Sequence, residues 1–516
     1  MTSYDDEYDE LTDESFDGPA GGSYVGDDDE DEIGLTAARD IDDDDDEIGL
    51  TPALRTDEDD LGESDDAFVR DVPLGVAVGA REYSATEQQL LVLDQAHVWH
   101  PYTQHQGMAL PIPIARARGA WLYETNGRPV LDAISSWWVT THGHCHPDIA
   151  EAIAEQARTL DHVMFAGFTH EPAVELASAL IARMPRGLAR VFFSDNGSTA
   201  VEVAIKMSLQ AFANNGTPRR LVAALEHAYH GDTFGAMATS GRGLFTTAFE
   251  PLLFDVARLP DPSEGDTLAA LDALLDARGH ELAAVIVEPL LLGAGGMRVW
   301  DERVLQRIRE RTRAAGVHLI ADEVLTGFGR TGPMWACERA DVSPDIMCLS
   351  KGITGGFLPL GATVATERIF DAFLGDRTRT FFHGHSYTAN PIACAAARAS
   401  LALHDEDSED ARIALEVAQA GHLATFASHP GVRAVRQIGT VAAVEMAGTP
   451  GYLSEIGREL SAFALDQGVL FRPLGNVAYV LPPYCMTTAE LARVYDVLAR
   501  FLDGERASHA GAGDVD

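Results

Sequence analysis

Only two residues of the chain are lysines, and one of them stands where an amine can do covalent chemistry. Lys351 follows the apolar run Ile346–Leu349 and precedes Gly352, so we expect its amine at the end of a strand, on a glycine-rich turn. A lysine amine forms a Schiff base with an aldehyde cofactor, and arginine cannot replace it. Lys206 lies inside the helical pattern Val201–Met207, where a surface or packing role is expected. Lys351 is therefore the candidate reactive lysine, and an ordinary salt-bridging lysine is the alternative.

An acidic residue ends a second strand. Asp322 follows the apolar run His318–Ala321. Pyridoxal chemistry needs a carboxylate beside the ring nitrogen, because the protonated ring is the electron sink of the reaction. An isolated aspartate at a strand end is more often a helix cap. An acid and a lysine that close two successive strands together predict pyridoxal 5′-phosphate as the cofactor.

Two further segments follow strands. Ser194–Thr199 opens a helical pattern, and backbone N–H groups at a helix start can bind a phosphate, although a plain N-cap is the alternative reading. In the segment Tyr229–Gly235, the ring of Tyr229 can stack on a planar cofactor. His230 has no second ligand at metal-binding spacing, so we expect no metal site and either a core histidine or one that supports a site residue from behind. The five cysteines are scattered without a C-x-x-C pair, which predicts buried or partly buried free thiols.

Buried parallel strands must position these residues. Short apolar runs alternate with amphipathic stretches such as Val201–Phe212 and Glu302–Ala315, which predicts an α/β fold with helices on both faces of a mostly parallel sheet. Ligands of such sheets lie beyond the carboxyl ends of the strands. The expected strands contain the runs Arg190–Phe193, Leu221–Ala224, Ala284–Val287, His318–Ala321 and Ile346–Leu349.

Residues 1–80 hold 29 acidic residues and only three arginines, which predicts a disordered acidic extension. Within it, the segment 31–36 recurs as 46–51, either as a duplicated docking motif or as drift in a solubilising tail. The formal net charge of −42 argues against nucleic-acid binding. We find no secretory signal and no apolar run of the ~18 residues that a membrane span needs. A cytoplasmic enzyme without membrane contact is therefore expected.

The segments Leu319–Gly332, Lys351–Gly352 and Tyr229–Gly235 resemble the class III aminotransferases of fold type I. The similarity runs from about residue 95 to 500. Other segments are similar to the members of this class that act in biotin synthesis, and these are His100–Thr103, Ser135–Trp138, His142–Gly143, Arg472–Gly475 and Tyr479.

The resemblance implies the fold of pyridoxal-phosphate-dependent transferases, with a mostly parallel seven-stranded sheet in a large domain and a smaller α+β domain built from both chain ends. The expected divisions are an extension 1–80, the first part of the small domain 81–150, the large domain 151–390, the rest of the small domain 391–505 and a disordered tail 506–516.

The resemblance also implies roles for individual residues. Lys351 would carry the cofactor and shuttle protons, Asp322 would pair with the pyridine nitrogen, and Tyr102 would take part in catalysis. Gly197, Ser198 and Tyr229 would bind the cofactor, together with Gly384 and Ser386 from the second subunit of a homodimer. Substrates would contact Tyr102, Trp137, Trp138, Tyr229, Asp232, Gly384 and Tyr479, with Arg472 on the substrate carboxylate.

The implied reaction converts 8-amino-7-oxononanoate to 7,8-diaminononanoate, with S-adenosylmethionine as the expected amino donor and lysine as the alternative. Three positions depart from the family pattern: Leu292 stands where glutamine is usual, His385–Ser386 where Pro-Thr is usual, and Asn196 where serine is common. Other readings are a class III transaminase of ω-amino acids or diamines, an aminomutase of the same fold, and a non-catalytic scaffold whose acidic extension is the functional part.

Overall fold

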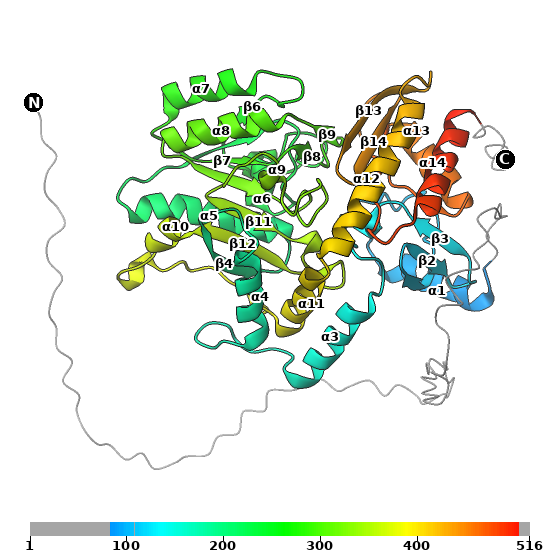
Figure 1. Ribbon diagram of the computed structural model, residues 1–516, viewed down its shortest axis with the longest axis horizontal. Helices are drawn as coiled ribbons and strands as arrows, with labels where there is room; N and C mark the ends of the chain where they lie inside the picture. Colours follow the sequence, from blue (N-terminus) through cyan, green and yellow to red (C-terminus); the bar gives the residue numbers. More distant parts are fainter. Residues whose placement is uncertain (1–82, 108, 505–516) are drawn as a thin grey trace, which may run out of the picture. The chain divides into compact units, whose positions relative to one another are not determined.

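A seven-stranded sheet forms the centre of the larger part of the molecule. The computed structural model describes residues 83–107 and 109–504 (Figure 1). The strands of this sheet, in spatial order, are β4 (Leu188–Ser194), β12 (Gly361–Thr366), β11 (Ile346–Leu349), β10 (His318–Asp322), β7 (Leu282–Val287), β5 (Leu221–Leu225) and β6 (Val256–Leu259). Only β12 runs against its two neighbours, so the prediction of a mostly parallel sheet is confirmed, as are the five strands expected from the sequence.

Helices cover both faces of this sheet, and the side chains of each strand alternate between them. On one face, Ile320 and Ile346 pack with residues of α5 (Gly197–Asn214). On the other face, Leu319 and Met347 belong to the core that contains α7 (Thr267–Arg278) and α8 (Glu302–Ala314). Because both faces are covered, the inner strands are buried along their whole length, which explains their continuous apolar sequences.

Strands from the two ends of the described chain form a second sheet. Its order is β1 (Ile114–Arg118), β2 (Trp121–Glu124), β3 (Pro129–Asp132) and β15 (Val469–Leu470). β15 runs parallel to β3, with Val469 opposite Leu131. This pairing confirms a smaller α+β part that is built from both chain ends. A third sheet lies beside it and contains β13 (Val432–Ile438), β14 (Val441–Met446) and β16 (Val477–Val480).

The remaining elements are α1 (Ala85–His97), α2 (Ser135–Trp138), α3 (Pro147–Thr159), α4 (Glu171–Ile181), α6 (Phe234–Thr239), η2 (Glu250–Leu252), β8 (Leu291–Leu292), β9 (Arg298–Val299), α9 (Ala336–Arg339), η3 (Lys351–Thr354), α10 (Glu367–Asp371), η4 (Arg377–Arg379), α11 (Pro391–Ala402), α12 (Glu406–Phe426), α13 (Glu455–Asp466) and α14 (Thr488–Leu502). None of the described helices is both long and apolar enough to cross a membrane. The expected domain boundaries stay a prediction, and the expected extension 1–80 and tail 506–516 lie outside the described residues.

The cysteines are all free, but not all of them are buried. Cys337, Cys348 and Cys394 are buried as expected, whereas Cys145 and Cys485 are exposed. The prediction was wrong for these two because each lies on a connection at the surface rather than on a core strand or helix. Cys145 follows α2, and Cys485 precedes α14.

Candidate active site

A cavity of about 750 Å³ opens at the carboxyl ends of the parallel strands. It brings together residues that are far apart in the sequence and were expected in the site. They are Trp138, Gly197, Ser198, Tyr229, Asp232, Asp322 and Lys351. The strand register explains why Asp322 and Lys351 lie in the same cavity. Asp322 at the end of β10 pairs with Cys348 in β11, three residues before Lys351.

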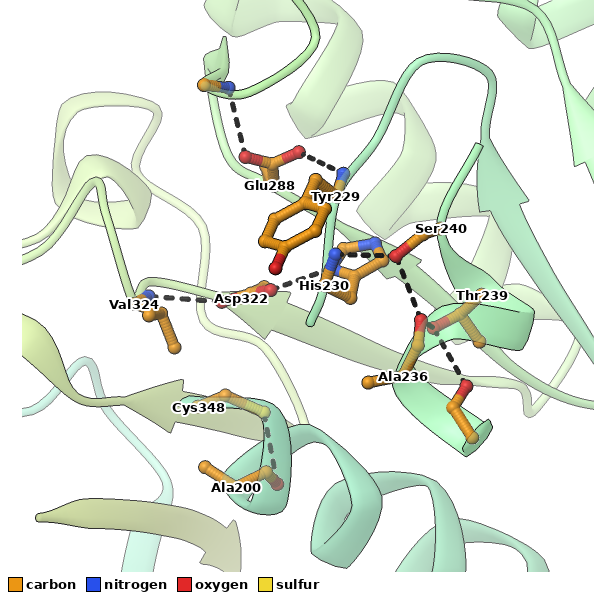
Figure 2. A network of polar contacts seen from close by, with 12 residues as sticks. Ala200, Tyr229, His230, Ala236, Thr239, Ser240, Glu288, Asp322, Val324 and Cys348 are labelled. Carbon is orange, nitrogen blue, oxygen red and sulfur yellow. Dashed lines mark hydrogen bonds and ion pairs between the residues drawn. The ribbon is translucent and has the colours of Figure 1, made fainter. Parts of the chain in front are cut away.

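The carboxylate of Asp322 is fixed by two hydrogen bonds (Figure 2). One oxygen lies 2.6 Å from Nδ1 of His230, and the other accepts a hydrogen bond of 3.1 Å from the backbone N–H of Val324. Asp322 and His230 are both buried, so His230 is a buried histidine that supports a site residue, which fits both readings expected from the sequence. The backbone N–H of His230 donates to Ser240 at the end of α6. These contacts hold Asp322 in one orientation at the cavity wall.

A second buried acid, Glu288, was missed by the sequence reasoning. It directly follows β7, much as Asp322 is the last residue of β10, so the strand-end rule that pointed to Asp322 would have found it. Its two oxygens accept backbone hydrogen bonds of 2.8 Å from Tyr229 and 3.0 Å from Gly293 (Figure 2). Burial raises the pKa of Glu288 to about 7. Glu288 thus anchors the backbone that carries the Tyr229 ring beside the cavity.

The backbone of Lys351 is left-handed, with a φ of 42°, which is a strained conformation for a residue with a side chain. Its Nζ atom lies 4.6 Å from the centre of the Trp138 ring. Burial lowers the pKa of Lys351 to about 8, although the charges of Asp322 and Glu288 favour the protonated amine. About a tenth of the amine is therefore neutral, and nucleophilic, at pH 7.

The start of α5 forms an anion cradle. Asn196 caps the helix and accepts a hydrogen bond from the N–H of Thr199. In the described part of the chain, the N–H groups of Gly197 and Ser198 have no hydrogen-bond acceptor. A Cβ atom on Gly197 would lie 2.7 Å from a methyl group of Val324, so glycine is needed there. Two free N–H groups at a helix N-terminus suit a phosphate.

A hydroxyl that the sequence reasoning missed completes this cradle. The Oγ1 atom of Thr233 lies 2.8 Å from the hydroxyl of Ser198, which also accepts a hydrogen bond from the N–H of Thr233. A Cβ atom on Gly231, whose φ is +128°, would overlap the side chain of Ser198. Thr233 was not singled out because it stands in a loop with no periodic pattern.

Tyr102 lies at the rim of the cavity. Its hydroxyl is 3.0 Å from that of Tyr229 and also donates a hydrogen bond to Asp232. Burial, aided by the hydrogen bond to Asp232, raises the pKa of Tyr102 to about 12. The ring of Tyr102 meets the ring of Trp137 edge to face, at 5.5 Å between centres. Tyr102 is therefore a neutral hydrogen-bond donor. It connects the cavity to the residues beside it, such as Trp137, which we call the outer wall.

The outer wall also contains Arg472, whereas Tyr479 is buried and contacts Trp138. The guanidinium of Arg472 lies 3.9 Å above the centre of the Trp137 ring. Trp138 donates a hydrogen bond of 2.8 Å from its indole nitrogen to the hydroxyl of Tyr479. The structure thus places Tyr102, Trp137, Arg472 and Tyr479 beside the cavity rather than on its innermost surface.

Several predicted residues lie away from the cavity of their own chain. Gly384 and Ser386 are exposed and do not line it. Leu292 is buried in β8 and does not line it either. Lys206 contacts His383 at 2.9 Å on the exposed side of α5, as expected for a surface lysine.

The residues present fit pyridoxal 5′-phosphate. The cavity offers a lysine amine of lowered pKa, a buried carboxylate, an aromatic ring and a helix start with free N–H groups. These match, in the same order, the aldehyde, ring nitrogen, ring face and phosphate of that cofactor.

Comparisons with known proteins agree with this chemistry. The family model for class III aminotransferases matches residues 102–502. The adenosylmethionine-8-amino-7-oxononanoate aminotransferase of Synechococcus elongatus is 51% identical over 420 residues, which cover 79% of this chain and 98% of that protein. The Mycobacterium leprae protein of the same name is 38% identical and covers 79% of this chain and 95% of its own length.

Solved structures are similar as well. The crystal structure of the Methanocaldococcus jannaschii protein of that name has a TM-score of 0.77 and 33% identity, and covers 80% of this chain and 99% of its own. A pyridoxal-phosphate-bound amine transaminase from an uncultivated Pseudomonas species has a TM-score of 0.72 and 31% identity, over 78% of this chain and 97% of its own.

Lys351→Ala should prevent covalent attachment of pyridoxal 5′-phosphate, because Lys206 is the only other lysine and lies outside the cavity. The measurement is borohydride reduction of the loaded protein, followed by mass spectrometry of its peptides. Lys206→Arg is the matched control and should keep the label on Lys351. A label on Lys206 in the wild-type protein would contradict the assignment.

The rate at which cofactor-free enzyme captures pyridoxal 5′-phosphate should rise with pH and level off above about pH 8, since only the neutral amine of Lys351 attacks an aldehyde. An ordinary lysine has a pKa of about 10.4, and capture would then keep rising about tenfold per pH unit to beyond pH 10. Stopped-flow absorbance between pH 6 and 10 distinguishes the two curves. A rate that still climbs at pH 10 would show that burial does not lower this pKa.

Proposed function

The chain belongs to the class III aminotransferases, and from this premise we propose that it aminates 8-amino-7-oxononanoate to 7,8-diaminononanoate in biotin synthesis. The observation that carries the proposal is the 51% identity to the Synechococcus elongatus enzyme over 98% of that protein's length. The protein is thus a transferase of amino groups that depends on pyridoxal 5′-phosphate.

The outer wall of the cavity suits the carboxylate of this acceptor. Among the described residues, Arg472 has no carboxylate partner, and the Trp137 ring covers one face of its guanidinium. A guanidinium that is held in place by an aromatic ring presents its N–H groups in a fixed fork, which binds a carboxylate by two parallel hydrogen bonds. Arg472 therefore fixes the far end of the acceptor while its keto group lies near Lys351.

The cofactor, when bound, supplies the electron sink for cleaving the bond between an α-carbon and its proton. Residues of the chain have separate roles toward it. Asp322, held by His230, keeps the ring nitrogen protonated. Lys351 would hold the cofactor through its aldehyde carbon, and its Nζ would move the proton at the substrate carbon that loses or gains the amino group. The N–H groups of Gly197 and Ser198 bind the phosphate. The donor leaves as a keto product before the acceptor enters, so both substrates use one cavity.

We also propose a homodimer with shared active sites in the cytoplasm. Gly384 and Ser386 are exposed and lie outside the cavity of their own chain, which is what residues that serve a second subunit require. The hydroxyl of Ser386 can replace that of the usual threonine on the phosphate. The amino donor that we propose is S-adenosylmethionine.

The proposed function is tested with purified enzyme, 8-amino-7-oxononanoate and either S-adenosylmethionine or lysine as donor. Formation of 7,8-diaminononanoate, followed by mass spectrometry, is the expected result, and it should require an external donor. Product formation without a donor would indicate an aminomutase. Turnover only of ω-amino acids or diamines with pyruvate would overturn the proposal in favour of an ω-transaminase.

Arg472→Ala should raise the KM for 8-amino-7-oxononanoate at least ~30-fold and change the KM for the donor much less. Truncation of one partner of a desolvated charge pair typically costs ~2–5 kcal/mol. Arg303→Ala is the control, because Arg303 is an exposed arginine at the start of α8. The measurement is steady-state kinetics of each half-reaction. Equal damage to both half-reactions would count against a carboxylate-binding role for Arg472.

A further inference from the structure

A row of aromatic rings leads from the active-site cavity to the loop before α13. Tyr102, whose hydroxyl lies 3.0 Å from that of Tyr229, has its ring centre 5.8 Å from that of Phe245. Phe245 in turn lies 4.8 Å from the ring of Tyr452. Both ring pairs meet edge to face, at 84° and 78°, which is a favourable geometry for aromatic rings. The row therefore forms a continuous aromatic surface between the cavity and Tyr452.

Tyr452 borders a second cavity of about 540 Å³. Leu244 and the segment 449–456 line it. Its apolar side chains are open to solvent: Tyr452 is 39% exposed, Leu244 57% and Leu453 73%. Exposed apolar side chains that gather in a concave surface are typical of a site that a ligand covers.

The loop around this cavity is joined to the segment that carries Arg472. The carbonyl oxygen of Gly451 approaches Gly475 so closely that a Cβ atom at position 475 would overlap it. Gly475 also has a φ of +61°, so this turn favours glycine for two independent reasons. Arg472 stands three residues earlier. The second cavity thus adjoins the substrate-binding wall of the first, without sharing its lining residues.

The polar groups of the second cavity are Thr449, Ser454 and Glu455. Ser454 is the N-cap residue of α13, but its hydroxyl makes no capping hydrogen bond. Glu455 pairs with Arg458, and 68% of its side chain is exposed. An aromatic ring for stacking, with hydroxyl and carboxylate groups beside it, matches a purine nucleoside, whose base stacks and whose sugar hydroxyls donate hydrogen bonds. The acceptor is a linear keto acid and has neither group.

We propose that the second cavity is an outer subsite for the adenosine half of the amino donor, with Tyr452 stacking on the adenine. The inference rests on the proposed function, because it takes S-adenosylmethionine as the donor. The amino-acid end then reaches Lys351 along the rings of Phe245 and Tyr102. The sulfonium cation between the two halves lies against these aromatic rings, which attract cations.

The binding test uses adenosine as the probe and calorimetry of the loaded enzyme, so that no turnover is needed. Adenosine should bind the wild-type enzyme and compete with S-adenosylmethionine. Tyr452→Ala should weaken adenosine binding about tenfold, since stacking of a base on an aromatic side chain is lost. Tyr452→Phe keeps the ring and should bind as the wild type does. Val417→Ala, at an exposed site on α12, is the surface control and should change nothing.

The kinetic test separates this inference from the proposed function. Tyr452→Ala should raise the KM for S-adenosylmethionine about tenfold and leave the KM for 8-amino-7-oxononanoate unchanged. Unaltered adenosine binding in Tyr452→Ala, or equal damage to both substrates, would overturn the inference. Amination of the acceptor with lysine alone, and no adenosine binding, would overturn it while the proposed function stands. If no donor aminates the acceptor, the proposed function fails, and calorimetry still decides whether the adenosine subsite exists.

Discussion

Asp322 and His230 form a buried pair at 2.6 Å, and the arrangement of the active site depends on it. A buried carboxylate without a partner is costly, and removal of one member of such a pair typically destabilises a protein by ~3–5 kcal/mol. β10 therefore has to end where His230 can reach it, which places the loop after β5 over the edge of the sheet. The position of β10 between β7 and β11 then sets Glu288 and Lys351 on either side of Asp322. The lowered pKa of Lys351 is the outcome of burial opposed by these two carboxylates.

The rigid sheet behind the site keeps strained backbone conformations and close contacts in place. Lys351 has a left-handed backbone, and Gly197 and Gly231 allow contacts that a Cβ atom would block. Each of these features costs free energy locally. Lys351 lies two residues after β11 and Gly231 six residues after β5, while Gly197 begins α5, whose residues pack against the core of the sheet. An apolar layer that cannot rearrange keeps a reactive amine and an anion cradle in fixed positions.

Strand ends predicted one part of the site, and the resemblance to class III aminotransferases predicted other residues that line the cavity, including Trp138 and Asp232. Lys351, Asp322 and the segment Ser194–Thr199 were found because each lies at or just after the end of an apolar run. Glu288 also lies at a strand end, but in its segment only Leu292 was singled out, as a departure from the family pattern. The row of Tyr102, Phe245 and Tyr452 was not predicted, because its contacts join distant segments without periodicity. Gly384 and Ser386 were named from the resemblance alone, and our proposal of a homodimer is what gives them a role, since they lie outside the cavity of their own chain.

The seven-stranded and the four-stranded sheets carry different functional residues, those for the reaction and those for substrate recognition. The large sheet carries Lys351 and Asp322, while Trp137 and Arg472 follow β3 and β15 of the small sheet, which pair in parallel. A transaminase must admit two unlike substrates to one reactive centre in turn. On our proposals the inner cavity serves both, Arg472 selects the acceptor by its carboxylate, and Tyr452 selects the donor by its nucleoside. The close contact of Gly451 with Gly475 joins the segments that carry Tyr452 and Arg472. Either residue can therefore be changed without moving the reactive lysine.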